Sequence, residues 1–194
     1  DLLSMTNLPC DRFAAIPMKT ADGQYQQISP YLLQLESELY SLVRPKQSID
    51  STLRPASALY RHGITYLEVR CLDLNPLVPE GLTRETSALI DLLLMHGLLL
   101  PSPLLSDHEQ DVAHANFTRM MAHGLDSQAT IEWQGESINA HDQLRAMLES
   151  MEPLAHVMDQ CESSADGIYT RSLKTYLQSS SIGTTLPSHQ LLSH

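Results

Sequence analysis

The chain has 194 residues, of which 42% are hydrophobic, so it can bury a substantial core. Its formal net charge is −11, whereas nucleic acids and anionic membrane surfaces attract basic proteins. We therefore expect neither a nucleic-acid nor a membrane partner. A phosphorylated small molecule is still compatible with this charge, because a few well-placed cations suffice to bind it.

The three cysteines, Cys10, Cys71 and Cys161, are widely spaced and form no metal-binding or disulfide pattern. Reduced thiols are typical of the cytoplasm, which is where we expect the protein to act. The longest apolar run, near 92–100, is far too short to cross a bilayer. The chain begins with Asp1 and shows no basic-then-apolar leader, so we expect no signal peptide and interpret the chain as a fragment of a longer protein.

Residues 1–30 carry several prolines and glycines and are predicted to be irregular. Alternating side chains then predict a strand over 31–43, with Glu36, Glu38 and Tyr40 on one face. Residues 44–60 are predicted to form a loop and a short turn. A second strand is predicted over 64–73, which is rich in β-branched and aromatic residues.

The second half of the sequence has the periodicity of helices. Four are predicted, near 83–99, from a cap at Ser106 to a stop at Gly124, from about Asn139 with a kink or a break at Pro153, and over about 166–178. The expected inner faces of the first two helices comprise Leu89, Leu92, Leu93 and Met95, then Val112, Ala113, Phe117, Met120 and Met121. A short strand or hairpin is expected at 130–135.

Strands followed by helices indicate an α+β fold, with the helices packed on one side of an antiparallel sheet. We expect three parts: a sheet region over 1–80, a helical region over 81–178, and a loose tail over 179–194 that is rich in serine and threonine.

The residues with chemical potential lie on the second predicted strand. Alternation places Tyr66, Glu68 and Arg70 on one face, with Glu68 and Arg70 roughly 7 Å apart along the strand. An exposed ion pair contributing well under about 1 kcal/mol is the simpler interpretation of these two residues alone. The nine histidines form no cluster, and we assign none of them to catalysis.

Two longer motifs change that interpretation. Residues 38–46 read Glu-Leu-Tyr-Ser-Leu-Val-Arg-Pro-Lys, and residues 64–76 read Ile-Thr-Tyr-Leu-Glu-Val-Arg-Cys-Leu-Asp-Leu-Asn-Pro. Together they resemble the proteobacterial glutamate–cysteine ligases, which carry Glu-Leu-Tyr-x-x-Ile-Arg-Pro-Lys and Tyr-Ile-Glu-Val-Arg-x-Leu-Asp-x-Asn-Pro at a similar separation. The resemblance is clear over 31–80 and weaker through the third predicted helix.

The resemblance implies part of a glutamine-synthetase-like antiparallel sheet followed by a helical region. It also implies ATP- and Mg²⁺-dependent ligation of the glutamate side-chain carboxylate to the cysteine amine through a γ-glutamyl phosphate, the first step of glutathione synthesis. In that family pattern Glu68 is a magnesium ligand, Arg70 contacts the transferring phosphoryl group and Tyr40 holds the cysteine carboxylate. Arg44 and Lys46 either face ATP or structure their loop.

The implied partners are glutamate, cysteine, ATP and the N-terminal half of the same enzyme, which supplies further metal ligands in the family. We therefore expect this chain alone to be inactive. Two alternatives remain: a non-catalytic remnant or paralogue of the carboxylate–amine ligase superfamily, and a ligase for another amine. Magnesium-dependent ATP turnover with glutamate distinguishes an active ligase from the non-catalytic alternative. A comparison of cysteine with other amines distinguishes a cysteine ligase from a ligase for another amine.

Overall fold

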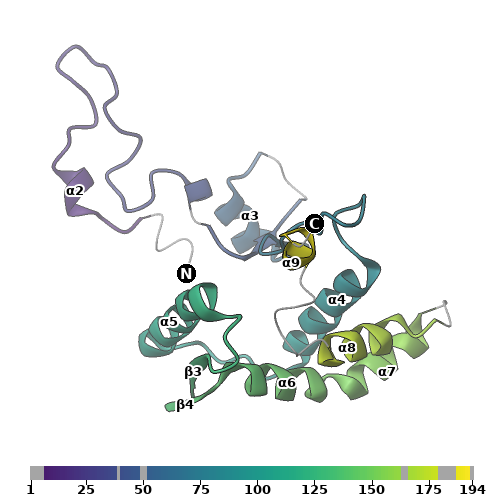
Figure 1. Cartoon of the computed structure of the whole chain (residues 1–194). Helices are drawn as coiled ribbons and strands as arrows, with labels where there is room; N and C mark the ends of the chain where they lie inside the picture. Colours follow the sequence, from purple (N-terminus) through teal and green to yellow (C-terminus); the bar gives the residue numbers. More distant parts are fainter. Residues whose placement is uncertain (1–6, 39, 49–51, 163–165, 179–186, 193–194) are drawn as a thin grey trace. The chain divides into compact units, whose positions relative to one another are not determined.

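The structure, a computed structural model, describes residues 7–38, 40–48, 52–162, 166–178 and 187–192 (Figure 1). The chain divides into two compact units, Asp1–Asp73 and Leu74–His194. Both contain helices and short antiparallel strands, which confirms the α+β prediction. The boundary between the units lies after Asp73, whereas the sequence suggested one after residue 80.

The first unit contains one two-stranded sheet and little regular helix. Its elements are α2 (Asp11–Ala14), the 3₁₀ turn η1 (Glu36–Glu38), β1 (Val43–Lys46), α3 (Pro55–His62) and β2 (Tyr66–Val69). β1 and β2 pair antiparallel, with Val43 opposite Val69 and Lys46 opposite Tyr66. Among its described residues only Ala56 and Ala58 are buried apolar side chains, so this unit has a small core.

The strand predicted over 31–43 is wrong, because pairing begins only at Val43. The carboxylate of Glu38 accepts a hydrogen bond from the backbone N–H of Gln34 at 2.8 Å, which favours a local turn. The carboxylate of Glu36 accepts one from the N–H of Ala56 at 2.9 Å, in the first turn of α3. Both glutamates therefore have structural roles. The loop predicted over 44–60 contains most of β1 and most of α3.

The second unit is mainly helical. Its elements are α4 (Arg84–Leu99), α5 (Asp107–His123), β3 (Thr130–Trp133), β4 (Glu136–Asn139), α6 (Ala140–Ser150), α7 (Glu152–Cys161), α8 (Ile168–Gln178) and α9 (Pro187–Leu192). The predicted capping box is confirmed: Ser106 Oγ accepts from the N–H of Glu109, whose carboxylate accepts from the N–H of Ser106. Most of the predicted tail lies outside the described residues, and α9 occupies the part that is described.

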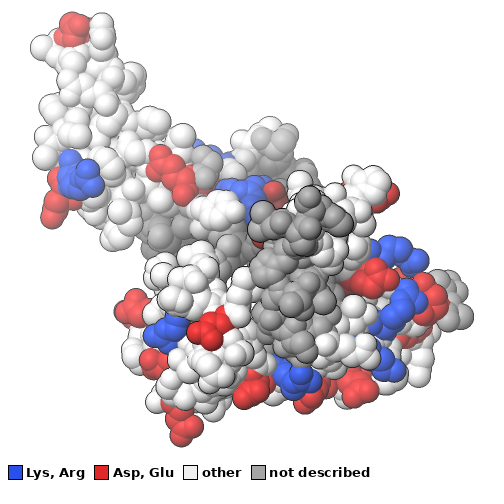
Figure 2. Space-filling model, in the orientation of Figure 1, with Lys and Arg blue, Asp and Glu red and all other residues white. Residues whose placement is uncertain are grey.

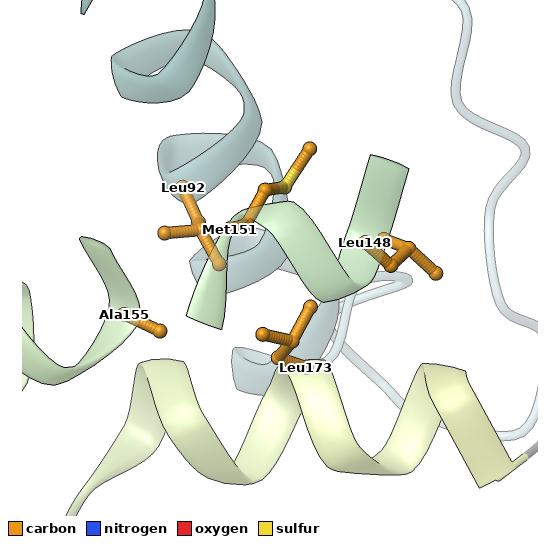
Figure 3. Packing of buried hydrophobic residues seen from close by; sticks show 5 residues of the cluster. All are labelled: Leu92, Leu148, Met151, Ala155 and Leu173. Atoms are coloured by element: carbon orange, nitrogen blue, oxygen red, sulfur yellow. The ribbon is translucent and has the colours of Figure 1, made fainter. Parts of the chain in front are cut away.

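The core of the second unit lies where α4, α6, α7 and α8 meet (Figure 3). It consists of Leu92, Leu148, Met151, Ala155 and Leu173. Leu92 and Met151 are fully buried. The predictions for Leu93 and Met95 were wrong: they are 43% and 40% exposed, because α4 buries only the side that faces α7 and α8.

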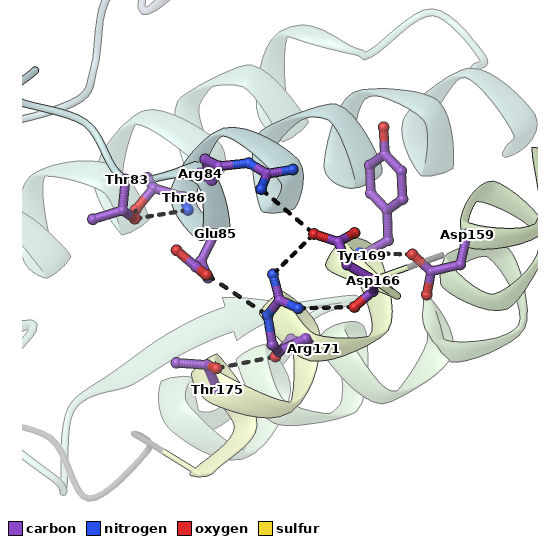
Figure 4. Close-up of polar contacts among 9 residues, drawn as sticks. All are labelled: Thr83, Arg84, Glu85, Thr86, Asp159, Asp166, Tyr169, Arg171 and Thr175. Carbon is purple, nitrogen blue, oxygen red and sulfur yellow. Dashed lines mark hydrogen bonds and ion pairs between the residues drawn. The ribbon is translucent and has the colours of Figure 1, made fainter. Parts of the chain in front are cut away.

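Polar contacts join α4 to the start of α8 (Figure 4). Arg171 lies 3.7 Å from a carboxylate oxygen of Glu85 and 3.6 Å from one of Asp166, which also pairs with Arg84 at 3.4 Å. Thr86 and Tyr176 share a hydrogen bond of 2.9 Å between their hydroxyls. These exposed ion pairs orient the helices around the apolar core and add little stability individually.

Asp159 of α7 caps the first turn of α8. Its carboxylate accepts hydrogen bonds from the backbone N–H groups of Tyr169 and Thr170, at 2.9 and 3.0 Å, and from the Thr170 hydroxyl. Burial raises the pKa of Asp159, but these hydrogen bonds outweigh it and leave the pKa lower than usual. The carboxylate therefore remains ionised and satisfies helix N–H groups that otherwise lack partners.

We expect Asp159→Asn to lower the free energy of unfolding by about 1–2 kcal/mol at neutral pH, because an amide is a weaker acceptor than a carboxylate. Because folding lowers the pKa of Asp159, its carboxylate stabilises the folded state at pH values above its unfolded-state pKa. This stabilisation is lost as the pH falls through the folded-state pKa. The difference between wild type and variant should therefore shrink in acid. Urea unfolding at neutral and acidic pH checks this, with the exposed Glu149→Gln as control. An equal effect of both variants, or a difference that grows in acid, would contradict the capping role.

Across the ranges that the structure describes, no helix combines the length and hydrophobicity that a membrane crossing requires. Figure 2 shows acidic and basic side chains interspersed over the face it presents.

Candidate active site on the first paired strands

The pairing of β1 with β2 brings several sequence-predicted site residues to one face. Arg44 lies opposite Glu68 and Lys46 opposite Tyr66, and directly opposed residues of an antiparallel pair point to the same side. Arg70 follows Glu68 at the two-residue period of a strand, and its N–H donates to the carbonyl of Leu42 at 2.8 Å. This face therefore carries three cations and one carboxylate.

Glu68 lies at the centre of the polar contacts on this face. The guanidinium of Arg70 binds this carboxylate through two hydrogen bonds. Nε donates to Oε1 at 2.9 Å and Nη2 donates to Oε2 at 3.1 Å. Lys46 Nζ lies 3.0 Å from Glu68 Oε2. The three side chains are each about a third exposed, so they remain accessible to a bound molecule. We call Lys46, Glu68 and Arg70 the Glu68 cluster.

The electrostatics of the Glu68 cluster favour anions. Hydrogen bonds from Lys46 and then Arg70 lower the pKa of Glu68 below its usual value, so this carboxylate stays ionised. Including Arg44, the face carries three positive charges and one negative charge, within a chain of net charge −11. Arginine presents a planar fork that matches the oxygens of a phosphoryl or carboxylate group. The face can therefore bind such an anion.

The fit of this face to magnesium is limited. Among the residues that the structure describes, no three His, Cys, Asp or Glu side chains gather where they could hold a metal ion. Magnesium in phosphoryl-transfer sites is commonly held by one or two carboxylates together with substrate phosphates and water. Glu68 fits the role of one such carboxylate, but the adjacent Lys46 and Arg70 repel a bare cation. The face thus suits magnesium that arrives together with phosphate groups.

Other predicted residues lie apart from these contacts. Tyr40 is 66% exposed and precedes β1, and within the described ranges no hydrogen bond joins it to the Glu68 cluster. Arg44 shares the face of Glu68 but forms no ion pair within those ranges. The contact between Lys46 and Glu68 was not foreseen, since it depends on a pairing register that the sequence does not specify.

Gln47 is a positioning residue that sequence reasoning missed. Its amide nitrogen donates to the carbonyls of His62 and Gly63 at 3.2 and 3.0 Å, and its Oε1 accepts from Thr65 Oγ1 at 2.6 Å. These bonds join the end of β1 to the segment before β2, next to Lys46. No spacing rule identifies such a residue. The signal that could have found it is its position directly after the Arg-Pro-Lys run.

We expect Lys46→Met to raise the pKa of Glu68, because removing a cation that donates to a carboxylate disfavours its charged form. Carbon-detected NMR titration of the Glu68 carboxyl measures this directly. Lys19→Met is the control, since Lys19 lies over the Tyr25 ring and does not contact Glu68. An unchanged Glu68 pKa in Lys46→Met would show that the contact does not persist in solution.

Comparison with known proteins gives consistent results. The model of the glutamate–cysteine ligase family matches residues 1–120. A glutamate–cysteine ligase of Pseudomonas fluorescens is 33% identical over 171 residues, which cover 88% of this chain and 32% of the relative. One from Saccharophagus degradans is 30% identical over 194 residues, covering 100% of this chain and 36% of the relative. The chain thus spans about a third of the length of these curated relatives.

A solved structure shares the fold. The crystal structure of a Francisella tularensis glutamate–cysteine ligase in complex with AMP matches with a TM-score of 0.81 at 25% sequence identity. The match covers 99% of this chain and 38% of that chain. The fold of this chain therefore matches part of a ligase. Since the family model also matches more than half of the sequence, the chain belongs to the glutamate–cysteine ligase family.

Proposed function

We propose that this chain supplies part of the active site of an ATP- and Mg²⁺-dependent enzyme that joins the side-chain carboxylate of glutamate to the amine of cysteine. The observation that carries this proposal is the Glu68 cluster, three charged side chains in mutual contact within the family's own motif. A cytoplasmic setting goes with this function, because it provides ATP and reduced cysteine.

The reaction brings two anions together. A glutamate carboxylate oxygen attacks the terminal phosphorus of ATP and ADP leaves, which gives a γ-glutamyl phosphate. The cysteine amine then attacks the acyl carbon and phosphate leaves with that oxygen. The protein's contribution to such steps is mainly positioning and charge stabilisation.

Each residue of the face has a role in this proposal. Glu68 holds the Nε and Nη2 side of the Arg70 guanidinium, and the N–H groups that remain bind the transferring phosphoryl group. Glu68 also offers an oxygen to magnesium, which when bound would neutralise phosphate charge. Lys46 and Arg44 bind the phosphates of ATP. Tyr40, being exposed before β1, is available to donate its hydroxyl to the cysteine carboxylate.

Arg70→Lys should reduce kcat by about 10- to 100-fold and change the KM for glutamate much less, because lysine keeps the charge but lacks the fork. Steady-state kinetics on the chain combined with the remainder of the enzyme measure both constants. Arg61→Lys, an exposed position at the end of α3, is the matched control. A variant that changes only KM would indicate that Arg70 binds glutamate in the ground state.

The proposal includes a partner, because the chain spans only about a third of its relatives. We expect the chain alone to form no γ-glutamylcysteine, and the chain mixed with the other two-thirds of the Pseudomonas fluorescens ligase to form it. Mass spectrometry of the product, with cysteine and other amines in parallel, provides the test. Robust turnover by the chain alone would contradict the shared site. A complex that forms without turning over any amine would instead favour a non-catalytic paralogue.

A further inference from the structure

Two polar side chains of helix α5 bind the backbone of the neighbouring strand β3. The Asn116 side chain donates to the Glu132 carbonyl at 2.7 Å and accepts from the Glu132 N–H at 2.9 Å. Arg119 donates to the Thr130 carbonyl at 3.2 Å. No residue of this 17-residue helix is buried. A surface helix normally buries an apolar stripe against its own core, and α5 does not.

Part of the apolar surface of α5 is exposed. Phe117 and Met121 are four residues apart and 40% and 67% exposed, and Leu125, just after the helix ends, is 54% exposed. The end of α4 and the loop that joins it to α5 are also apolar and exposed. Their five leucines are Leu98, Leu99, Leu100, Leu104 and Leu105, with exposures from 51% to 99%. We call these two features the α5 stripe and the leucine loop.

Exposed apolar features of this extent are unusual on a protein that has no partner, and they mark interaction surfaces. A second copy of this chain is a poor occupant, since each copy carries a net charge of −11. The first turns of α5 add Asp107, Glu109 and Asp111 beside the leucine loop. A suitable partner therefore has an apolar surface bordered by basic side chains.

We propose that the α5 stripe and the leucine loop dock against the complementary two-thirds of the ligase. This inference rests on the proposed function, because it takes the partner from there and assigns its binding surface on this chain. In the Francisella ligase, the elements matching this chain occupy 38% of a longer polypeptide, so a larger body of protein is present there to cover exposed faces. Burial of the stripe and loop would stabilise the complex, because both features are exposed among the described residues.

The test measures binding of this chain to the immobilised complementary two-thirds of the Pseudomonas fluorescens ligase. Met121→Asp and Leu104→Asp should each weaken binding at least about tenfold, since each buries an unpaired charge. Val157→Asp is the matched control. It introduces the same charge at a residue of α7 that is 53% exposed and lies outside both features, and it should bind as the wild type does. Circular dichroism shows whether each variant remains folded.

Equal binding of all four proteins, or no binding by the wild type, overturns the proposal. Light scattering provides a further check. If the wild type forms a homodimer that Met121→Asp converts to a monomer, the proposal is also overturned, because a second copy then covers the surface. The product assay separates this inference from the proposed function. If the expected binding pattern occurs without γ-glutamylcysteine formation, the docking surface stands and the catalytic proposal falls. If γ-glutamylcysteine forms while all variants bind equally, the catalytic proposal stands and the docking proposal falls.

Discussion

Replacing Glu68 with glutamine is expected to reduce ligation by on the order of 10³-fold in the complex of this chain with the rest of the enzyme. A neutral amide is a poor magnesium ligand. The substitution also removes the negative charge that lies between Lys46 and Arg70, whose side chains both contact Glu68. The two cations would then repel each other, and the fork of Arg70 would lose its orientation. Initial rates over a range of magnesium concentrations measure the effect.

The matched control for Glu68→Gln is Glu38→Gln, the same change in the same unit. Glu38 accepts one hydrogen bond from the Gln34 N–H, and a glutamine oxygen can also accept it. Glu38→Gln should therefore retain near-normal activity, while both variants keep the wild-type circular dichroism spectrum. If Glu68→Gln retained the wild-type rate and magnesium dependence, its assignment as a metal ligand would be wrong.

Truncating Leu92 to alanine is expected to lower the free energy of unfolding by about 2–5 kcal/mol. Leu92 is fully buried in the cluster that joins α4 to α7 and α8, so its removal leaves a cavity lined by side chains from three helices (Figure 3). A domain of this size is stable by only about 5–15 kcal/mol, so the loss is a large fraction of the total. Denaturant unfolding followed by circular dichroism measures it.

Ser172→Ala is the control for this experiment, because Ser172 is also fully buried in the second unit. Within the described residues its hydroxyl has no hydrogen-bond partner, so removing it sacrifices no bond. We expect a change within about 1 kcal/mol, in either direction. Similar losses for Leu92→Ala and Ser172→Ala would indicate that the helices do not pack around Leu92 as described.

Local signals in the sequence predicted helices α4 to α8, whereas α2, α3 and α9 were not predicted. The Thr83 hydroxyl accepts from the Thr86 N–H, and the Asn139 side chain accepts from two N–H groups of α6, as caps do. Pro153 lies in the first turn of α7, where a proline sacrifices no hydrogen bond, and the predicted break falls beside it. Such signals act over a few residues and do not depend on distant parts of the chain.

Features that depend on distant residues could not be predicted. The alternation over 31–43 matched a strand, but Glu36 bonds to Ala56, twenty residues away, and the segment turns instead. The expected inner face of α5 included Phe117 and Met121, which are exposed, because periodicity identifies an apolar side but not what covers it. At the site, alternation predicted that Glu68 and Arg70 share a face. The contribution of Lys46 required the pairing of β1 with β2.

The fate of one oxygen atom tests the central claim, that this chain contributes to phosphoryl transfer onto the glutamate side chain. Glutamate labelled with ¹⁸O in its side-chain carboxylate is supplied with ATP, magnesium and cysteine to the complex of this chain with the complementary part of the ligase. The account predicts one ¹⁸O atom in each phosphate released, and loss of that signal in Glu68→Gln but not in Glu38→Gln. Formation of γ-glutamylcysteine with unlabelled phosphate would contradict it.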